Sequence, residues 1–267
     1  MTEPLTVATV APHLQTRWLG RTLHAFAALD STNTTARELA AAGAADGTVV
    51  IADAQRAGRG RLGRSWASPA GKNLYLSALL RCEVPAERLA QISLLTGVAV
   101  CETVRAWCAA EIKWPNDVLS DGRKVAGILA EMDSAGAGHV IILGIGVNLN
   151  AVLDDFPEAL RDTAGSLRLA SGSSVDRARF AGRLLNNLEV RYEQWRRDGF
   201  APIAALWRSL TPLIGRNIRV QEPGASVDGT VLDLDVDGAL RLRLIDGTEH
   251  RVIAGDVTVI GGYEKSI

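Results

Sequence analysis

The amino-acid sequence predicts an α+β protein, in which a large unit of mixed helices and strands is followed by a small all-β module. In the first part, β-branched runs alternate with segments whose apolar residues recur at helical spacing. After about Pro212 only short strand runs remain, and the turns "EPG", "DVDG" and "IDG" separate them. We therefore predict two domains, residues 1–212 and residues 213–267.

The first ninety residues are expected to form one helix and two strands. Thr35 and Glu38 have the spacing of a capping box, which indicates a helix over residues 34–42. The β-branched run "TVVIADAQ", residues 48–55, predicts a strand, and strand character resumes in "NLYLSALLR", residues 73–81. The arginine- and glycine-rich stretch between these strands is therefore expected to be a loop.

The middle of the chain predicts a long helix and a hairpin. Over residues 86–110 apolar residues recur with helical spacing, and charged side chains interrupt them, which indicates a core helix rather than a membrane span. The segments "EIKWPNDVL" and "RKVAGILAEM" follow, and the turn signal at residues 120–122 joins them into a hairpin.

The remaining elements complete the two domains. The run "HVIILGIGVNLN", residues 139–150, predicts a buried strand that ends in a bend loosened by glycine. A later helix should stop near Gly199, and its apolar stripe consists of Phe180, Leu184, Leu188 and Trp195. From residue 216 to residue 260 we expect a five-stranded, barrel-like module, in which "LRLRLI" alternates strictly.

Composition limits the classes of function. The chain has 267 residues, 47% of them hydrophobic and 22% charged, as in an ordinary globular protein. The N-terminus lacks the features of a secretory signal, and no apolar run of about 18 residues would span a bilayer, so we expect a cytoplasmic protein. The three cysteines lack metal-ligand spacing, which argues against zinc.

The stretch "AGRGRLGRSW", residues 57–66, is the first candidate site. Its glycines have the spacing of a dinucleotide-binding fingerprint, but that fingerprint needs a helix to open at its last glycine. The proline and glycine of "SPAG" argue against such a helix, and the stretch lacks the ending of a phosphate-binding Walker loop. What remains is a glycine loop that presents Arg59, Arg61 and Arg64 to carboxylate or phosphate groups. A solvated basic loop is the alternative.

The hairpin carries the second candidate site. In "KWPNDV", Asn116 and Asp117 either form a turn or offer oxygen ligands to a nucleotide and its Mg²⁺ ion. Lys124 is expected on the same strand face as Ala126, Ile128 and Ala130. A tight turn would place Lys124 beside Leu119 with Asp117 further along, whereas a longer turn would bring Asn116 to that side. An edge lysine that prevents aggregation is the alternative.

Two glycines in "GIGVNLN" form the third candidate. Gly144 and Gly146 lie within a predicted buried strand, where glycine is uncommon. They indicate either a β-bulge or a place where a ligand approaches the backbone closely.

These stretches occur together in one family. After "STN", the motifs "GRGRLGRSW", "KWPNDV", "RKVAGILAE" and "GIGVNLN" stand in the order found in the biotin protein ligases, which this chain resembles over about residues 30–150. The resemblance implies a mixed-sheet catalytic domain like that of the class II synthetases and an SH3-like C-terminal barrel. It also implies a reaction in two steps, in which biotin and ATP form biotinyl-5′-AMP with Mg²⁺ and biotin is then transferred to a carrier lysine.

The resemblance further implies roles for individual residues. Lys124, Arg59 and Arg61 are expected to act in catalysis, Trp66 to pack on the adenine, and Asp117 to hold the metal ion. The residues expected to contact biotin are Ser31, Thr32, Asn33 and Gln55. A helix cap at Ser31 or Asn33 is the alternative, and the two roles are compatible. Arg59, Gly60 and Arg61 are expected to close over both biotin and the adenylate, and Lys124 to lie at the biotin carboxylate and the α-phosphate. The other residues expected to bind biotin or the nucleotide are Gly58, Arg64, Trp66, Asn116, Asp117, Gly127, Gly144, Gly146 and Asn148. Leu62 departs from the family pattern, which often has a polar or basic residue there, and this puts the affinity of loop closure in doubt.

Partners and alternatives follow from the same resemblance. The acceptor is expected to be the biotin carboxyl carrier protein domain of an acyl-CoA carboxylase, and the enzyme is expected to be a monomer or a weak homodimer without membrane association. A lipoate ligase would use the same fold class and the same adenylate chemistry. A biotin-responsive repressor would need a helix-turn-helix domain, and fewer than about thirty residues precede "STN", too few for that unit.

We accordingly predict no sequence-specific DNA binding, with or without biotin and ATP. A DNA reader needs a positive face that neutralises several phosphates, whereas this chain has a net charge of -1 and its arginines gather within one glycine loop. An electrophoretic mobility assay at physiological salt checks this expectation. A specific, biotin-dependent shift at nanomolar protein would instead support the repressor.

Overall fold

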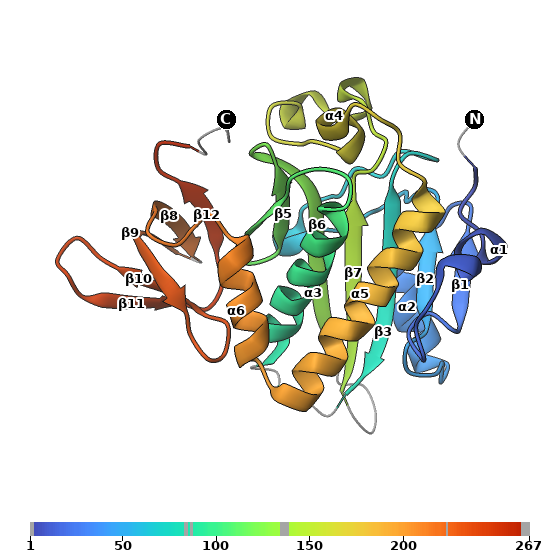
Figure 1. Ribbon diagram of the computed structural model, residues 1–267, viewed down its shortest axis with the longest axis horizontal. Helices are drawn as coiled ribbons and strands as arrows, with labels where there is room; N and C mark the ends of the chain where they lie inside the picture. Colours follow the sequence, from blue (N-terminus) through green and yellow to red (C-terminus); the bar gives the residue numbers. More distant parts are fainter. Residues whose placement is uncertain (1–2, 83–84, 86–87, 134–138, 223, 263–267) are drawn as a thin grey trace.

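The computed structural model describes residues 3–82, 85, 88–133, 139–222 and 224–262. Two sheets form its framework, and helices pack around the larger one (Figure 1). The larger sheet has the strand order β1-β2-β3-β7-β6-β5-β4; β1 and β2 are parallel, and the other neighbours are antiparallel. Its strands are β1 (Leu23–Phe26), β2 (Val49–Ala52), β3 (Leu74–Arg81), β4 (Glu111–Lys113), β5 (Asp117–Ser120), β6 (Arg123–Asp133) and β7 (Val140–Val147). This mixed sheet confirms the predicted α+β class.

Helices cover both faces of the larger sheet. Helices α3 (Leu89–Val104) and α5 (Arg177–Asp198) lie across the face seen at the front of Figure 1, and α2 (Thr32–Ala41) packs on the opposite face. Strand β2 is buried on both sides because alternate side chains join the two hydrophobic clusters. The shorter helices are α1 (Val7–Val10), α4 (Leu167–Ser171) and α6 (Ala201–Leu210), with 3-10 turns at Ala11–His13, Arg61–Gly63, Leu153–Asp155 and Glu158–Leu160.

The first predicted helix begins earlier than expected. It starts at Thr32 rather than at residue 34, because Ser31 has extended backbone angles and occupies the N-cap position. Thr35 and Glu38, which were expected to form a capping box, therefore lie inside the helix. The shift brings the "STN" residues to the N-terminal end of α2.

The later helices agree more closely with the sequence. Helix α3 is a core helix, as predicted, but it ends at Val104 because the following residues form a hydrogen-bonded turn; residues 86–87 lie outside the described part. Helix α5 ends at Asp198, and Gly199 follows it with a φ of 75°. Among the helices of the described segments, none is both long enough and apolar enough to cross a membrane.

The hairpin of β5 and β6 has the tight register. Ser120 pairs with Arg123, so Asp121 and Gly122 form a two-residue turn in which both have positive φ. Leu119 pairs with Lys124, as predicted for a tight turn.

The predicted strand face of Lys124 is wrong. The pairing of β5 with β6 shifts by one residue next to Val125, and this bulge breaks the simple alternation of side chains. The Lys124 side chain therefore lies against Gly127, whereas Ala126 and Ile128 belong to the main hydrophobic cluster. Because of the bulge, the ammonium group leaves the apolar face and reaches the opposite side of the sheet.

The C-terminal module has the five strands that were predicted. They are β8 (Asn217–Glu222), β9 (Ala225–Leu234), β10 (Leu240–Arg243), β11 (Glu249–Val252) and β12 (Asp256–Val259), in the antiparallel order β11-β10-β9-β8-β12. The indole N–H of Trp114 in the first part donates to the Gly238 carbonyl of the module at 3.1 Å. One hydrophobic cluster includes residues of both sheets, so the division into domains at residue 212 stays a prediction.

Two helical glycines should respond in opposite ways to replacement by alanine. At Gly97 in α3 an added Cβ would meet Ile112 at an ordinary 3.6 Å, so Gly97→Ala should raise the free energy of unfolding by about 0.5–1 kcal/mol through helix propensity. At Gly182 in α5 it would press on the His13 backbone carbon at 2.9 Å, so Gly182→Ala should lower that free energy by about 1–3 kcal/mol. Denaturant unfolding of the two variants, each the control for the other, checks this; equal effects would contradict the described packing.

Candidate functional site

One cavity of about 580 Å³ gathers the candidate residues. It lies between the larger sheet, the loop of residues 57–66 and the C-terminal module. Every site residue named from the sequence lines it except Gly58, where an added Cβ would stand 2.6 Å from the Trp66 carbonyl oxygen. The sequence therefore predicted most of the lining, and Gly58 instead packs beneath the loop.

The polar floor of the cavity is a hydrogen-bonded network at the N-terminal end of α2. The Thr32 N–H and hydroxyl both donate to Gln55 Oε1, at 2.9 and 3.2 Å. Behind them, the hydroxyl of Ser77 lies 2.8 Å from Thr32 Oγ1 and 2.6 Å from Asn33 Oδ1. Ser77 is fully buried on β3, and the sequence analysis missed it because nothing in its local pattern distinguishes it from a core serine.

Glycines on the sheet allow side chains to lie directly on its backbone. A Cβ at Gly144 would clash with Asn33 Oδ1, and a Cβ at Gly146 would stand 2.6 Å from Trp66 Cε2. Strand β7 pairs with β3 and β6 without a register shift, so the alternative of a β-bulge is wrong. The glycines instead create the space for Asn33 and Trp66.

The arginine and glycine loop folds back on itself and does not begin an α-helix. Gly60 N–H donates to the Arg64 carbonyl at 2.7 Å, and Trp66 N–H donates to the Gly58 carbonyl at 2.8 Å. Its turn contains Leu62, which has a φ of 55° and is 70% exposed. The rejection of a dinucleotide fingerprint is therefore confirmed, because no helix opens at Gly63.

Arg61 points into the cavity. Its guanidinium donates to Asn116 Oδ1 at 3.1 Å and to the carbonyl of Gly255, in the C-terminal module, at 3.4 Å. Burial lowers the pKa of Arg61 below its ordinary value, although the carboxylates of Asp256 and Asp117 oppose this shift. A purely solvated basic loop is therefore excluded for Arg61.

The other two arginines form ion pairs with different parts of the protein. Arg59 pairs with Glu131 of β6 at 2.8 Å, and Arg64 pairs with Asp256 of β12. The loop is thus held on one side by the larger sheet and on the other by the C-terminal module.

Two lysines add positive charge beside Trp66. Lys124 Nζ lies 2.6 Å from Asp117 Oδ1 and 5.4 Å from the centre of the Trp66 ring. Lys113, at the end of β4, also lines the cavity, and burial lowers its pKa. Lys113 stands in the motif "KWPNDV", but the sequence pattern alone indicates no role for it. Within the described residues the buried Trp66 Nε1 has no hydrogen-bond partner, so it is a donor available to a ligand.

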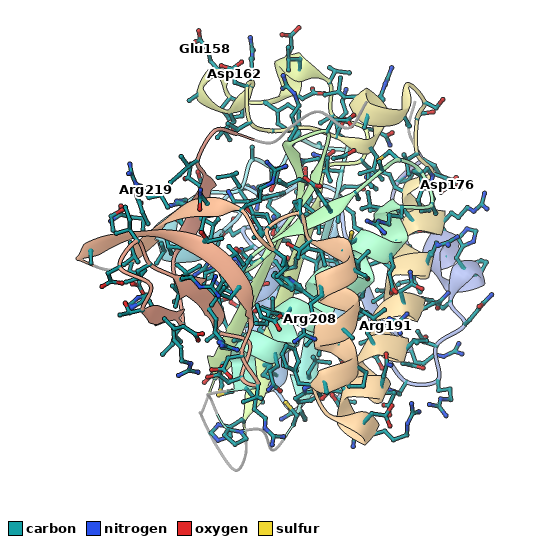
Figure 2. The ribbon with its side chains drawn as sticks, turned by 60° about the vertical axis from the view of Figure 1, so that its left-hand side comes forward. Glu158, Asp162, Asp176, Arg191, Arg208 and Arg219 are labelled. Atoms are coloured by element: carbon teal, nitrogen blue, oxygen red, sulfur yellow. The ribbon has the colours of Figure 1, made fainter. Side chains whose placement is uncertain are left out.

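Asn148 connects the sheet to the segment that precedes α4. Its side-chain amide donates to the Gly165 carbonyl at 2.9 Å and lies 3.5 Å from the Lys124 carbonyl. The segment places four further residues on the cavity wall, namely Phe156, Leu160, Thr163 and Ala164. Glu158 and Asp162, labelled at the top of Figure 2, mark its outer side.

The C-terminal module supplies the last wall. Its lining residues are Asp256, Thr258, Val259 and Gly262. Sequence reasoning missed them because they lie about 190 positions from the loop and meet it only in the folded chain. Figure 2 shows the module beside α6, where Arg208 donates to Asp233 at 2.6 Å.

The acidic groups at the cavity limit the kind of metal site. In the described residues no three His, Cys, Asp or Glu side chains cluster as a metal site. Asp117 offers one carboxylate and Asn116 one amide on the cavity wall. This donor set fits a magnesium ion that is held mainly by phosphate oxygens, with one protein carboxylate as a further ligand.

Comparisons with known proteins agree with this geometry. Residues 25–148 match the model of the biotin/lipoate A/B protein ligase family, and residues 213–259 match that of the biotin protein ligase C terminal domain. The biotin--[acetyl-CoA-carboxylase] ligase of Mycobacterium tuberculosis is 40% identical over 245 residues, which cover 89% of this chain and 88% of that protein. The chain belongs to the biotin protein ligase family.

Other family members are similar to most of this chain. The bifunctional ligase/repressor BirA of Bacillus subtilis is 38% identical over 247 residues, which cover 91% of this chain and 76% of that protein. The solved biotin protein ligase of Aquifex aeolicus, in complex with biotin and ATP, has a TM-score of 0.78 at 27% identity and covers 90% of this chain and 99% of that one.

The pair between Arg64 and Asp256 should hold the loop. We expect Asp256→Asn to make the backbone amides of residues 57–66 exchange hydrogen about two to five times faster, because a partly exposed ion pair contributes up to about 1 kcal/mol. Hydrogen exchange followed by mass spectrometry measures this. Asp228→Asn is the control, since it removes an exposed pair with Arg219 elsewhere in the module. Unchanged exchange in the loop of Asp256→Asn would rule out this tether.

Proposed function

We propose that this protein is an ATP-dependent biotin protein ligase, which converts biotin and ATP into biotinyl-5′-AMP and then transfers biotin to a lysine of a carrier protein. The observation that carries the proposal is one cavity whose floor is neutral and hydrogen-bonding while its outer part holds Arg61, Lys113 and Lys124. A neutral polar floor suits the ureido ring of biotin. Positive charge in the outer part suits a carboxylate and phosphates.

The contacts support a division of the cavity between the two substrates. Ser31, Thr32, Asn33 and Gln55 are proposed to bind biotin, because they form the floor. Trp66 lies on bare backbone at Gly127 and Gly146 and lines the cavity, and its ring is proposed to pack against the adenine. The remaining adenylate contacts are assigned to Gly60, Arg64, Asn116, Gly144 and Asn148, which line the cavity. Gly58 is proposed to act indirectly, because its missing side chain lets the Trp66 carbonyl lie close to it beneath the loop.

In the first step, an oxygen of the biotin carboxylate attacks the α-phosphorus of ATP. A bond forms between that oxygen and phosphorus, the bond to the bridging oxygen breaks, and pyrophosphate leaves. Negative charge gathers on the phosphoryl oxygens during this step, so the fixed charges of Lys124, Arg59 and Arg61 lower the barrier. Lys124 is held 2.6 Å from Asp117, which keeps its ammonium group at the cavity wall before the substrates arrive.

Magnesium fits the same end of the cavity. When bound with ATP it would neutralise phosphate charge, and Asp117 is the carboxylate that would hold it. The ion pair of Asp117 with Lys124 links the metal ligand to the catalytic cation.

In the second step, the amine of the acceptor lysine attacks the biotinyl carbonyl carbon, and AMP leaves as the amide forms. The mixed anhydride must be kept from water until then. Three walls close around the cavity, namely the loop, the segment before α4 and strand β12, and they support this protective role. The acceptor is proposed to be the carrier domain of an acyl-CoA carboxylase, and the enzyme a cytoplasmic monomer or weak homodimer that does not bind specific DNA.

Incubation with biotin, Mg²⁺ and ATP labelled in its α-phosphate tests the proposal. We expect labelled biotinyl-AMP, and transfer of biotin to an added carrier domain. Lipoate in place of biotin tests the closely related lipoate ligase activity, because the matched family model covers both kinds of ligase. Lipoyl-AMP without biotinyl-AMP would replace the proposed function.

Lys124→Ala should reduce the rate of adenylate synthesis by a factor of about 100 or more, because the lost cation faces charge that develops in the transition state. Thermal unfolding should stay close to that of the wild type, since the lysine is partly exposed at the cavity. Lys72→Ala is the control: it removes a lysine paired with Asp155 at 3.3 Å. Near-normal adenylation by Lys124→Ala would show that this lysine is an edge residue without a catalytic role.

A further inference from the structure

Glu131 lies where the floor of the cavity meets the arginine loop. One carboxylate oxygen, Oε2, accepts hydrogen bonds from the side-chain amide of Asn33 at 2.7 Å and from the guanidinium of Arg59 at 2.8 Å. The other oxygen, Oε1, pairs with Arg37 of α2 at 3.3 Å. A single side chain on β6 thus contacts both the helix that carries the floor and the loop that covers it.

The contact with Glu131 also decides which way the Asn33 amide faces. An ionised carboxylate only accepts hydrogen bonds, so the NH₂ group of Asn33 must point toward Glu131. Its oxygen then accepts from the hydroxyl of Ser77 at 2.6 Å. Asn33 rests directly on Gly144, where a Cβ would clash with it. Glu131 and Ser77 together fix the orientation of the amide at the cavity floor.

Arg59 is oriented by the same oxygen. The Arg59 side chain is 38% exposed, so packing restrains it little, and the ion pair with Glu131 defines the position of its guanidinium. Arg37 supplies a second positive charge beside Glu131, which offsets the charge of the carboxylate near the cavity. Any displacement of Glu131 therefore moves a floor residue and a loop residue at once.

We propose that Glu131 is a positioning residue that couples the biotin-binding floor to the loop that retains the adenylate. This inference rests on the proposed function. Asn33 and Arg59 both donate to Glu131 Oε2. When one of these donors is held in place, it therefore holds that oxygen in position to accept from the other. Binding of biotin at the floor thereby favours the loop position in which Arg59 reaches the adenylate. Glu131 touches neither the reacting atoms nor the cavity and acts through these two residues.

The test compares Glu131→Gln with Asp133→Asn. The glutamine keeps the size of the side chain but removes the charge that orients both donors. We expect about tenfold weaker biotin binding and about tenfold faster release of biotinyl-AMP, with little change in melting temperature, since charged hydrogen bonds are the stronger ones. Asp133→Asn removes a carboxylate from the same strand, and that carboxylate also pairs with Arg37, at 3.6 Å. It should bind biotin and retain the adenylate like the wild type.

A double-mutant cycle distinguishes coupling from general damage. The effects of Glu131→Gln and Arg59→Ala on the release rate should not add, because both remove the same contact. Additive effects, or wild-type release from Glu131→Gln, would overturn the proposal. Should Glu131→Gln lower the melting temperature, Glu131→Asp serves as the second variant. It keeps the charge and should release biotinyl-AMP more slowly than the glutamine variant; equal or faster release would also overturn the proposal. If the wild type forms no biotinyl-AMP, the proposed function itself fails.

Discussion

The close approach of side chains to bare backbone on the larger sheet determines the rest of the site. Gly127 and Gly146 lie on neighbouring strands, and Trp66 occupies the space that their missing side chains leave. Trp66 ends the arginine loop, and its N–H donates to the Gly58 carbonyl at the beginning of the loop. The packing of Trp66 on the sheet therefore fixes the position of both ends of the loop. Even a methyl group at Gly146 would stand within 2.6 Å of the indole, and the loop with its three arginines would have to move. Because Gly127 and Gly146 have no side chains, Trp66 can pack on the sheet, and the arginines of the loop are positioned with it.

Three of the positive charges around the cavity pair with carboxylates of the folded chain. Arg59 meets Glu131, Arg64 meets Asp256, and Lys124 meets Asp117. This local pairing explains how a chain of net charge -1 presents a cation-rich cavity. Anionic substrates must therefore share these cations with the internal carboxylates or displace the carboxylates from them.

Sequence reasoning was strongest where a site is made of short contiguous motifs. The residues of "STN", "GRGRLGRSW" and "GIGVNLN" meet in one cavity because α2 packs on the sheet, the loop connects β2 with β3, and β7 pairs with β3. The face of Lys124 was mistaken because strict alternation cannot reveal a bulge at Val125. Asp256 was missed for a different reason: a carboxylate at the start of an ordinary strand gains meaning only when the module packs against the loop. Ser77 and Glu131 likewise act through long-range contacts that no local pattern contains.

The hydrophobic cluster shared by both sheets has a practical consequence for cutting the chain. Helix α6 ends at Leu210 and β8 begins at Asn217, and apolar residues on both sides of this connection belong to the same cluster. A nick there would leave two fragments with complementary apolar surfaces, together with the indole of Trp114 and its acceptor carbonyl at Gly238. The fragments are therefore suited to reassembly without a peptide link, as a split enzyme whose cavity is complete only when both pieces are present.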